Sequence, residues 1–286
     1  MQLYSIDTGY FKLDGGAMFG VVPKTIWNKI NPADENNLCP WAMRSLLIED
    51  GNRLILIDNG IGDKQSDKFF KHYYLHGDAS LNSSLAANGF SPEDITDVIL
   101  THLHFDHCGG SVIKQNDKLL PAFKNAMYWS NQKHWNWAVY PNEREKASFL
   151  KENILPIQEN GQLEFIKDGK QFENNLPIQK FTENITVRFV DGHTESMMLP
   201  QINYNGKTIV FMADLLPSHG HIPIPYVMAY DMFPLTTLNE KKSFLNEAVI
   251  NDYILFFQHD PVYECCTLHD TERGIRPNEF LRIADL

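Results

Sequence analysis

The sequence predicts a mixed α/β fold in which antiparallel strand pairs alternate with helices. Two pairs of strand-like segments are joined by dipeptides that favour tight turns, Asp50-Gly51 and Asn205-Gly206. Segments with helix-start and helix-stop residues separate the other strand-like segments. Because such hairpins bring neighbouring strands together in antiparallel order, the pattern favours a mixed α/β sandwich over a purely parallel sheet.

The strands are predicted where apolar and β-branched residues run between turn residues. The first hairpin pairs 45–49 with 53–58, and the second pairs 197–204 with 207–214. Four further segments of the same kind are predicted as strands: 96–100, 126–129, 185–190 and 253–258. Together these segments supply the sheets of the predicted sandwich.

The helices are predicted between the strands from their end signals. Asp78 can cap a helix over 79–88 that ends at Gly89, and the sequence Ser-Pro-Glu-Asp at 91–94 has the pattern of a helix start. Further helices are predicted over three segments, of which the first two are rich in tryptophan and divided by a proline: 131–139, 142–153 and 237–250.

Composition limits the organisation and the partners of the chain. No linker, repeat or change of composition divides it, so residues 1–286 are predicted to form one domain. Acidic residues number 36 against 25 lysines and arginines, for a formal net charge of −11, and nucleic acids and anionic membranes are therefore not expected partners. We find no signal-peptide pattern, no transmembrane run and no disulfide spacing, so we expect a cytoplasmic protein.

The strongest functional signal is the sequence Thr-His-Leu-His-Phe-Asp-His-Cys-Gly-Gly at 101–110. His102 and His104 alternate by two positions after a predicted strand, which places both on one side of an extension of that strand. Asp106 and His107 follow after a turn, and the two glycines let the backbone pack closely behind them. Imidazole and carboxylate ligands suit zinc, manganese, iron or cobalt, so a site for one metal ion or two is predicted.

Three further candidate ligands lie where predicted strands meet loops: His193, Asp214 and His259. The order His-x-His-x-Asp-His, then His, Asp and His, resembles the metallo-β-lactamase-fold hydrolase superfamily, and the matching positions cover nearly the whole chain. The resemblance implies a four-layer αβ/βα sandwich with the metal site at one edge of its two sheets. It also implies two divalent metal ions, with zinc as the default and manganese, cobalt or iron as alternatives.

The resemblance assigns a role to each candidate. The ligands of the first ion are His102, His104 and His193. The ligands of the second ion are Asp106, His107 and His259. Asp214 bridges both ions, and Asp58 supports the ligands from behind. The implied reaction is attack by a metal-bridging hydroxide on a carbonyl carbon, with Asp106 as the catalytic residue that shuttles a proton.

The segments 15–24, 42–45 and 104–110 resemble the branch that holds quorum-quenching N-acyl-homoserine lactonases and methyl parathion hydrolase-like enzymes. This resemblance implies hydrolysis of a neutral ester-like bond, in the first place a lactone such as an N-acyl-homoserine lactone, in a small-molecule substrate with an apolar portion. Two alternatives stay open. One is phosphotriester or aryl ester hydrolysis at the same site, and the other is a metal-dependent binding protein without turnover.

Five residues are candidates for lining the substrate pocket: Phe19, Trp27, His219, His221 and Tyr230. The apolar segment that holds the first two is predicted to be either a lid or a dimer contact, and the branch resemblance implies a homodimer. One position departs from the lactonases, which place a lactone-contacting tyrosine three residues after the bridging aspartate. This chain has Pro217 there, and the sequence leaves open which residue replaces the tyrosine.

Overall fold

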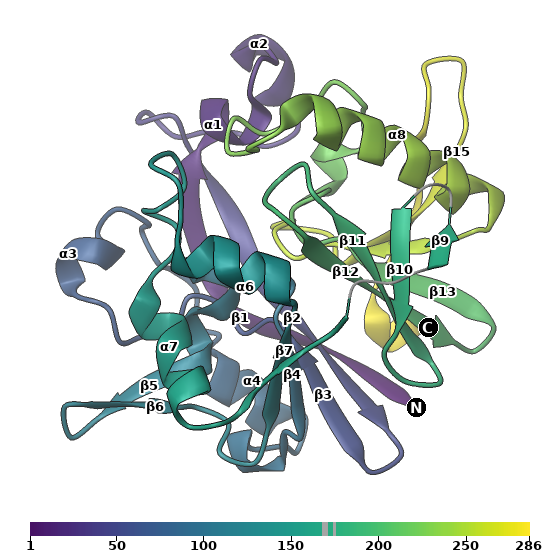
Figure 1. The fold of residues 1–286 in the computed structure, drawn as a ribbon. Helices are drawn as coiled ribbons and strands as arrows, with labels where there is room; N and C mark the ends of the chain where they lie inside the picture. Colours follow the sequence, from purple (N-terminus) through teal and green to yellow (C-terminus); the bar gives the residue numbers. More distant parts are fainter. Residues whose placement is uncertain (168–170, 174–175) are drawn as a thin grey trace. The chain divides into compact units, whose positions relative to one another are not determined.

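The computed structural model describes residues 1–167, 171–173 and 176–286, which form two compact units. Unit 1 comprises Met1–Tyr10 and Met43–Lys167, and unit 2 comprises Phe11–Ala42 and Asp168–Leu286. The strands β1 (Gln2–Asp14) and β2 (Leu38–Asp50) each run from one unit into the other. The predicted class, mixed α/β with several sheets, is confirmed (Figure 1). The prediction of one domain stays a prediction.

The main sheet of unit 1 has the strand order β1-β2-β3-β4-β7-β8. Its remaining strands are β3 (Arg53–Ile57), β4 (Asp97–Ile99), β7 (Met127–Ser130) and β8 (Leu163–Phe165). The first predicted hairpin is confirmed, because β2 and β3 are antiparallel and Asp50 pairs with Arg53. The pairs β3–β4, β4–β7 and β7–β8 are parallel. A separate two-stranded sheet joins β5 (Val112–Gln115) and β6 (Lys118–Pro121).

Unit 1 has five α-helices in its described residues: α3 (Asp67–Phe70), α4 (Leu81–Ala87), α5 (Phe105–Cys108), α6 (Gln132–Val139) and α7 (Lys151–Glu159). Two 3₁₀ turns are η1 (Pro92–Asp94) and η2 (Gly109–Ser111). The helix predicted over 79–88 is α4, but its cap is Ser80 and not Asp78, because the Ser80 hydroxyl accepts from the Ser83 amide. The helix start at 91–94 gives only one turn, which leads at once into β4.

The helix predicted over 142–153 is wrong over most of its length. Residues 143–148 form turns, and α7 begins only at Lys151. The side chain of Asn142 accepts from the amides of Arg144 (2.9 Å) and Glu145 (3.1 Å), which closes a local turn in place of a helix. The neighbouring prediction over 131–139 is confirmed by α6, which begins at the Asn131 cap.

The core of unit 1 is formed by apolar side chains of the sheet and of the helices α6 and α7. Val98 and Tyr128 of the sheet, Ala138 of α6 and Ile154 and Ile157 of α7 are all fully buried in one cluster. Burying one such aliphatic side chain contributes about 1.5–3 kcal/mol, so this cluster fixes the strand ends from which the site loops begin.

Unit 2 is built on a sheet of strand order β16-β15-β14-β13-β12-β11-β10-β9. The strands are β9 (Gln171–Glu173), β10 (Leu176–Lys180), β11 (Ile185–Val190), β12 (Met197–Tyr204), β13 (Lys207–Phe211), β14 (Ile254–Phe256), β15 (Cys265–His269) and β16 (Arg276–Leu281). The second predicted hairpin is confirmed: β12 and β13 are antiparallel around Asn205 and Gly206, whose φ angles of 52° and 75° suit a primed turn. Only β13 and β14 pair in parallel among the described strands of this sheet.

Three α-helices belong to the described part of unit 2: α1 (Gly15–Phe19), α2 (Lys24–Trp27) and α8 (Pro234–Ile250). The 3₁₀ turns are η3 (His219–His221) and η4 (Ile283–Asp285). Helix α8 begins three residues before the predicted 237, with Pro234 in its first turn, where proline is tolerated. The buried ion pair of Arg188 with Glu247 (Nη1–Oε2 3.0 Å) links β11 to α8. In the described ranges, we find no helix long and apolar enough to cross a membrane.

Candidate metal centre

Unit 1 gathers four of the predicted ligands within eight residues after β4. His102 and His104 lie in the extended segment that follows the strand, and Asp106 and His107 lie on α5. One ring nitrogen of His102 lies within 4.8 Å of a ring nitrogen of His104, and the same is true of His102 and His107. Asp106 Oδ2 lies 3.8 Å from His107 Nε2. All four side chains are buried, so a divalent ion among them would be largely removed from water.

The two glycines after the ligands permit a close backbone approach. A Cβ atom at Gly109 would lie 2.0 Å from the Ile61 carbonyl oxygen, and one at Gly110 would lie 2.3 Å from the Asn59 carbonyl oxygen. Such distances exclude any side chain at these positions without a shift of the backbone. The prediction that these glycines let the chain pack closely behind the ligands is therefore confirmed.

Asp58 holds the start of the ligand loop and one of its histidines. Its carboxylate accepts from the Thr101 amide (2.8 Å) and hydroxyl (2.7 Å) and lies 3.0 Å from His107 Nδ1. Its φ of 54° is a left-handed conformation that few non-glycine residues adopt, and such strain persists where surrounding contacts enforce it. Because Nδ1 of His107 is engaged by Asp58, Nε2 is the nitrogen left for a metal.

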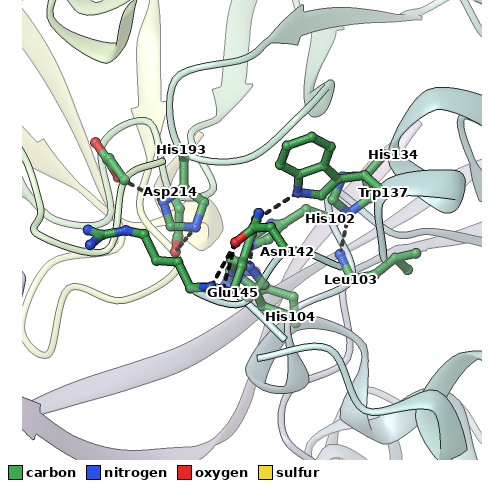
Figure 2. Close-up of polar contacts among 12 residues, drawn as sticks. His102, Leu103, His104, His134, Trp137, Asn142, Glu145, His193 and Asp214 are labelled. Carbon is green, nitrogen blue, oxygen red and sulfur yellow. Dashed lines mark hydrogen bonds and ion pairs between the residues drawn. The ribbon is translucent and has the colours of Figure 1, made fainter. Parts of the chain in front are cut away.

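Glu145 holds one ring nitrogen of His104, as Asp58 does for His107. The sequence alone does not reveal this role. Its Oε1 lies 3.0 Å from His104 Nε2, while Oε2 accepts from Trp137 Nε1 (2.6 Å) and Asn142 Nδ2 (3.2 Å), as Figure 2 shows. The carboxylate is only 2% exposed. His104 therefore has its Nδ1 left for a metal, in contrast to His107.

His134 is a second supporting residue that the sequence alone does not reveal. Its Nε2 accepts from the amide of Leu103, the residue between His102 and His104, at 2.8 Å (Figure 2). Its own backbone amide donates to the Asn131 side chain at the start of α6. The helix thus fixes the backbone that carries two of the predicted ligands.

Unit 2 brings together the other three predicted ligands. Asp214 lies between two imidazoles: its Oδ2 is 3.2 Å from His193 Nε2, and its Oδ1 is 3.2 Å from His259 Nε2. Figure 2 shows the contact of His193 with Asp214. Strand β13 ends at Phe211, and Ala213 adopts a φ of 40°, so Asp214 is presented from a strained turn and not from the strand predicted to reach it.

The histidines of unit 2 are also oriented from behind. His193 Nδ1 lies 2.8 Å from Asp231 Oδ1, and His259 Nδ1 lies 2.7 Å from the Ala42 carbonyl oxygen. Metal-binding histidines commonly donate their second nitrogen to a carboxylate or a carbonyl in this way. In each unit, the imidazole and carboxylate donors and their hydrogen-bond partners thus fit divalent metal ions.

The five predicted pocket residues have different surroundings. Phe19 stacks on Trp27 (centroids 5.4 Å apart, planes at 8°) and on His221 (4.7 Å, 4°), and all three are buried inside unit 2. Ser218 and the Met18 carbonyl engage both nitrogens of His221, and burial lowers its pKa to about 3. The three stacked rings thus form part of the uncharged interior of unit 2. The pocket role of these residues stays a prediction, as do those of His219 and of Tyr230, which is 39% exposed.

Comparisons with known proteins also indicate a metal-dependent hydrolase. The sequence profile of the Metallo-beta-lactamase superfamily matches residues 44–259. An N-acyl homoserine lactonase of Bacillus cereus is 26% identical over 165 residues, which are 54% of this chain and 56% of that protein. The match therefore spans little more than half the length of that relative.

Two solved structures show the same fold over almost the whole chain. A probable metal-dependent hydrolase from Staphylococcus aureus has a TM-score of 0.87 at 27% identity, covering 98% of this chain and 96% of that chain. AidC, a dizinc quorum-quenching lactonase in complex with a product, N-hexanoyl-L-homoserine, has a TM-score of 0.77 at 21% identity, covering 98% and 95%. The likeness to AidC concerns the fold alone.

Proposed function

The chain belongs to the metallo-beta-lactamase superfamily of hydrolases, and we propose that it is a dinuclear metal-dependent hydrolase of a neutral ester-like bond, in the first place an N-acyl-homoserine lactone. The observation that carries the proposal is the set of buried histidines whose second nitrogens are already engaged by carboxylates or a carbonyl. The lactonase from Bacillus cereus supports the substrate class.

In this proposal the ligands of the two units share two ions. The first ion would be held by His102, His104 and His193. The second would be held by Asp106, His107 and His259. Asp214 would bridge them, which is supported by its two oxygens facing two different imidazoles. Zinc is the proposed metal because nitrogen and carboxylate donors suit it, and manganese, cobalt and iron suit the same donors.

The reaction follows from what each group supplies. When bound, two divalent ions lower the pKa of water toward neutrality and polarise a carbonyl oxygen. Asp106 offers one carboxylate oxygen as a ligand and the other to accept and pass on a proton. Asp58, Glu145 and Asp231 keep the imidazoles in one orientation, so that these rings need not reorganise during the reaction.

We propose Tyr73 as the residue that takes the place of the tyrosine missing at Pro217. Position 217 itself makes only a backbone contact in the described residues, because the carbonyl of Pro217 accepts from the His259 amide. The nearby His221 has both ring nitrogens engaged, so it does not replace the tyrosine. The ring of Tyr73 contacts Phe105 (centroids 4.7 Å apart), next to Asp106. Burial, with a further contribution from the charge of Asp106, raises the pKa of Tyr73 to about 12. Its hydroxyl therefore stays a proton donor, able to hold a lactone oxygen.

Replacing the Tyr73 hydroxyl tests this role. In Tyr73→Phe the ring contact with Phe105 stays, but the donor is lost, so KM for a lactone should rise roughly tenfold, the effect of about 1.4 kcal/mol. Steady-state kinetics measures it, and Tyr74→Phe, which changes the exposed neighbouring tyrosine, is the matched control. Equal kinetics of Tyr73→Phe and the wild type would remove Tyr73 from the site.

The function itself is tested by ring opening of a long-chain N-acyl-homoserine lactone, followed with a pH indicator. The zinc-loaded wild type should open the ring, and Asp106→Asn should lose orders of magnitude in turnover while keeping its fold. Full activity of Asp106→Asn would contradict the role of Asp106.

A substrate panel separates the remaining alternatives. Higher turnover on paraoxon-like phosphotriesters or aryl esters than on lactones would change the proposed substrate class but not the proposed metal site. Full metal occupancy without hydrolysis of any substrate would favour a binding protein. The homodimer, the cytoplasmic location and the absence of nucleic acid and membrane partners stay predictions.

A further inference from the structure

Unit 2 contains a cavity of about 540 Å³ whose lining includes none of the predicted metal ligands. A cavity of this volume is within the range that holds small organic molecules. The residues around it come from the loop after α2, from η3 and the loop that follows it, and from the hairpin of β15 and β16.

One wall of the cavity is apolar because its polar backbone groups are engaged elsewhere. The fully buried ammonium group of Lys241 on α8 donates to the carbonyls of Pro223 (3.1 Å), Ile224 (3.3 Å) and Tyr226 (2.6 Å). Proline has no amide hydrogen, and the Tyr226 amide donates to the Pro223 carbonyl. This wall therefore offers mostly proline, isoleucine and tyrosine side chains, held in place by α8.

The charged side chains of the lining are cationic, although the protein is acidic. The lining contains Arg273 and Arg276 and neither aspartate nor glutamate, although acidic residues outnumber lysines and arginines by 36 to 25 in the chain. Within the described residues, neither arginine forms a salt bridge, and Arg276 Nη1 donates only to the Ile275 carbonyl (2.7 Å). Two guanidinium groups beside an apolar wall suit an anion with an apolar tail.

A third polar group connects the cavity with a metal-ligand loop. His219 lines the cavity, and both its amide (2.9 Å) and its Nδ1 (2.5 Å) contact Asp260 Oδ2. Asp260 is fully buried and follows His259 directly, and its other oxygen accepts from the amides of Val262 and Tyr263. Displacement of His219 by a ligand would therefore act on the segment that carries His259.

We propose that this cavity is a second binding site, for a small amphipathic monocarboxylate such as a medium-chain fatty acid. Arg273 and Arg276 bind the carboxylate, and the wall of Pro223–Tyr226 with Ile30 and Ile275 binds the alkyl chain. Occupancy is transmitted through His219 and Asp260 to the loop of His259. Binding at this cavity does not require hydrolysis, so its test is independent of the test of the proposed function.

Octanoate is the probe, titrated calorimetrically into the purified full-length protein. We expect saturable binding with a Kd at or below about 1 mM. Octanamide, which has the same chain without the charge, should bind at least tenfold more weakly. So should octanoate itself with the double variant Arg273→Gln/Arg276→Gln. Arg282→Gln, which removes an exposed arginine paired with Asp285, is the matched control and should bind as the wild type does.

Hydrogen exchange gives the second readout. Saturating octanoate should slow amide exchange at 219–221 and 258–263 in the wild type and leave both segments unchanged in the double variant. Three results would overturn the proposal: no saturation by octanoate, equal affinity for octanamide, or unchanged octanoate affinity in the double variant. The last result would place the carboxylate elsewhere, for example on the metal ions. If the double variant folds poorly, the single variant Arg273→Glu takes its place in the test. It reverses an exposed charge and should abolish octanoate binding.

Discussion

A carboxylate at one ring nitrogen orients three of the site imidazoles. Asp58 and Asp231 engage the Nδ1 atoms of His107 and His193, whereas Glu145 engages the Nε2 atom of His104. Which nitrogen faces a metal is thus fixed before a metal binds. Such preorganisation raises metal affinity, because a ring that is already oriented loses less rotational freedom on binding.

Glu145→Gln tests this at one residue. Glutamine keeps the size of the side chain and an acceptor oxygen, but it removes the charge that favours a proton on Nε2 of His104. Zinc affinity should fall about tenfold to a hundredfold, the usual effect of losing such a partner. Competition with a fluorescent zinc chelator measures it. Glu143→Gln, which alters an exposed carboxylate of the same segment, should bind zinc as the wild type does, and equal affinity of both variants would contradict the role of Glu145.

The metal ligands could be predicted from the sequence, but the residues that support them could not. His102, His104, Asp106 and His107 are predictable because a local motif collects them after a strand. Glu145 stands 41 residues from the histidine that it supports, and Asp231 stands 38 residues from His193. Isolated acidic residues look alike in a sequence, so only the fold pairs these two with their histidines.

At the scale of elements, α8 holds the loop that presents His193. Glu240 accepts from the amides of Asp191 (2.7 Å) and Gly192 (3.0 Å), and a Cβ atom at Gly192 would lie 2.3 Å from Thr237 Oγ1. Burial raises the pKa of Glu240 from its usual value of 4.5 to about 7. The helix therefore carries a carboxyl group that favours its neutral form.

The raised pKa of Glu240 predicts a pH dependence of stability. Between about pH 4.5 and 7 the folded protein binds more protons at this group than the unfolded chain does. The contribution of Glu240 to the free energy of unfolding should therefore be present at low pH and decrease as the pH rises through this window. Urea unfolding at several pH values should show a decline in the wild type that is smaller in Glu240→Gln. Glu272→Gln, at an exposed position, should decline like the wild type, and parallel curves for all three would refute the assignment.

Elements were predictable where their signals are local. The second hairpin carries Asn205 and Gly206 at the two positions with left-handed angles, and α6 begins at its asparagine cap. In the first hairpin only Gly51 of the predicted dipeptide lies in the turn and has a left-handed angle, because Asp50 is still paired with Arg53. The segment 142–153 has helical composition, but its Asn142 side chain binds the following amides and its Glu145 turns inward to His104. A contact with a distant residue thus overrides local preference there.

At the scale of the whole molecule, the predicted ligands are divided between two units, with four in unit 1 and three in unit 2. Ions shared by both sets would bind the folded chain and not the unfolded one. Chelation with EDTA should therefore lower the melting temperature, and added zinc should restore it. Calcium, which prefers oxygen ligands, is the control and should not restore it. A melting temperature that EDTA leaves unchanged would contradict ions shared between the units.

The central claim is a two-metal hydrolase, and elemental analysis of catalytically active protein tests it most directly. Purified wild type that opens lactones should contain about two divalent ions per chain, and Asp214→Ala should lose both metal and activity, because one carboxylate serves both ions. Active wild-type protein that contains no divalent metal, or Asp214→Ala with undiminished metal content and activity, would contradict the account.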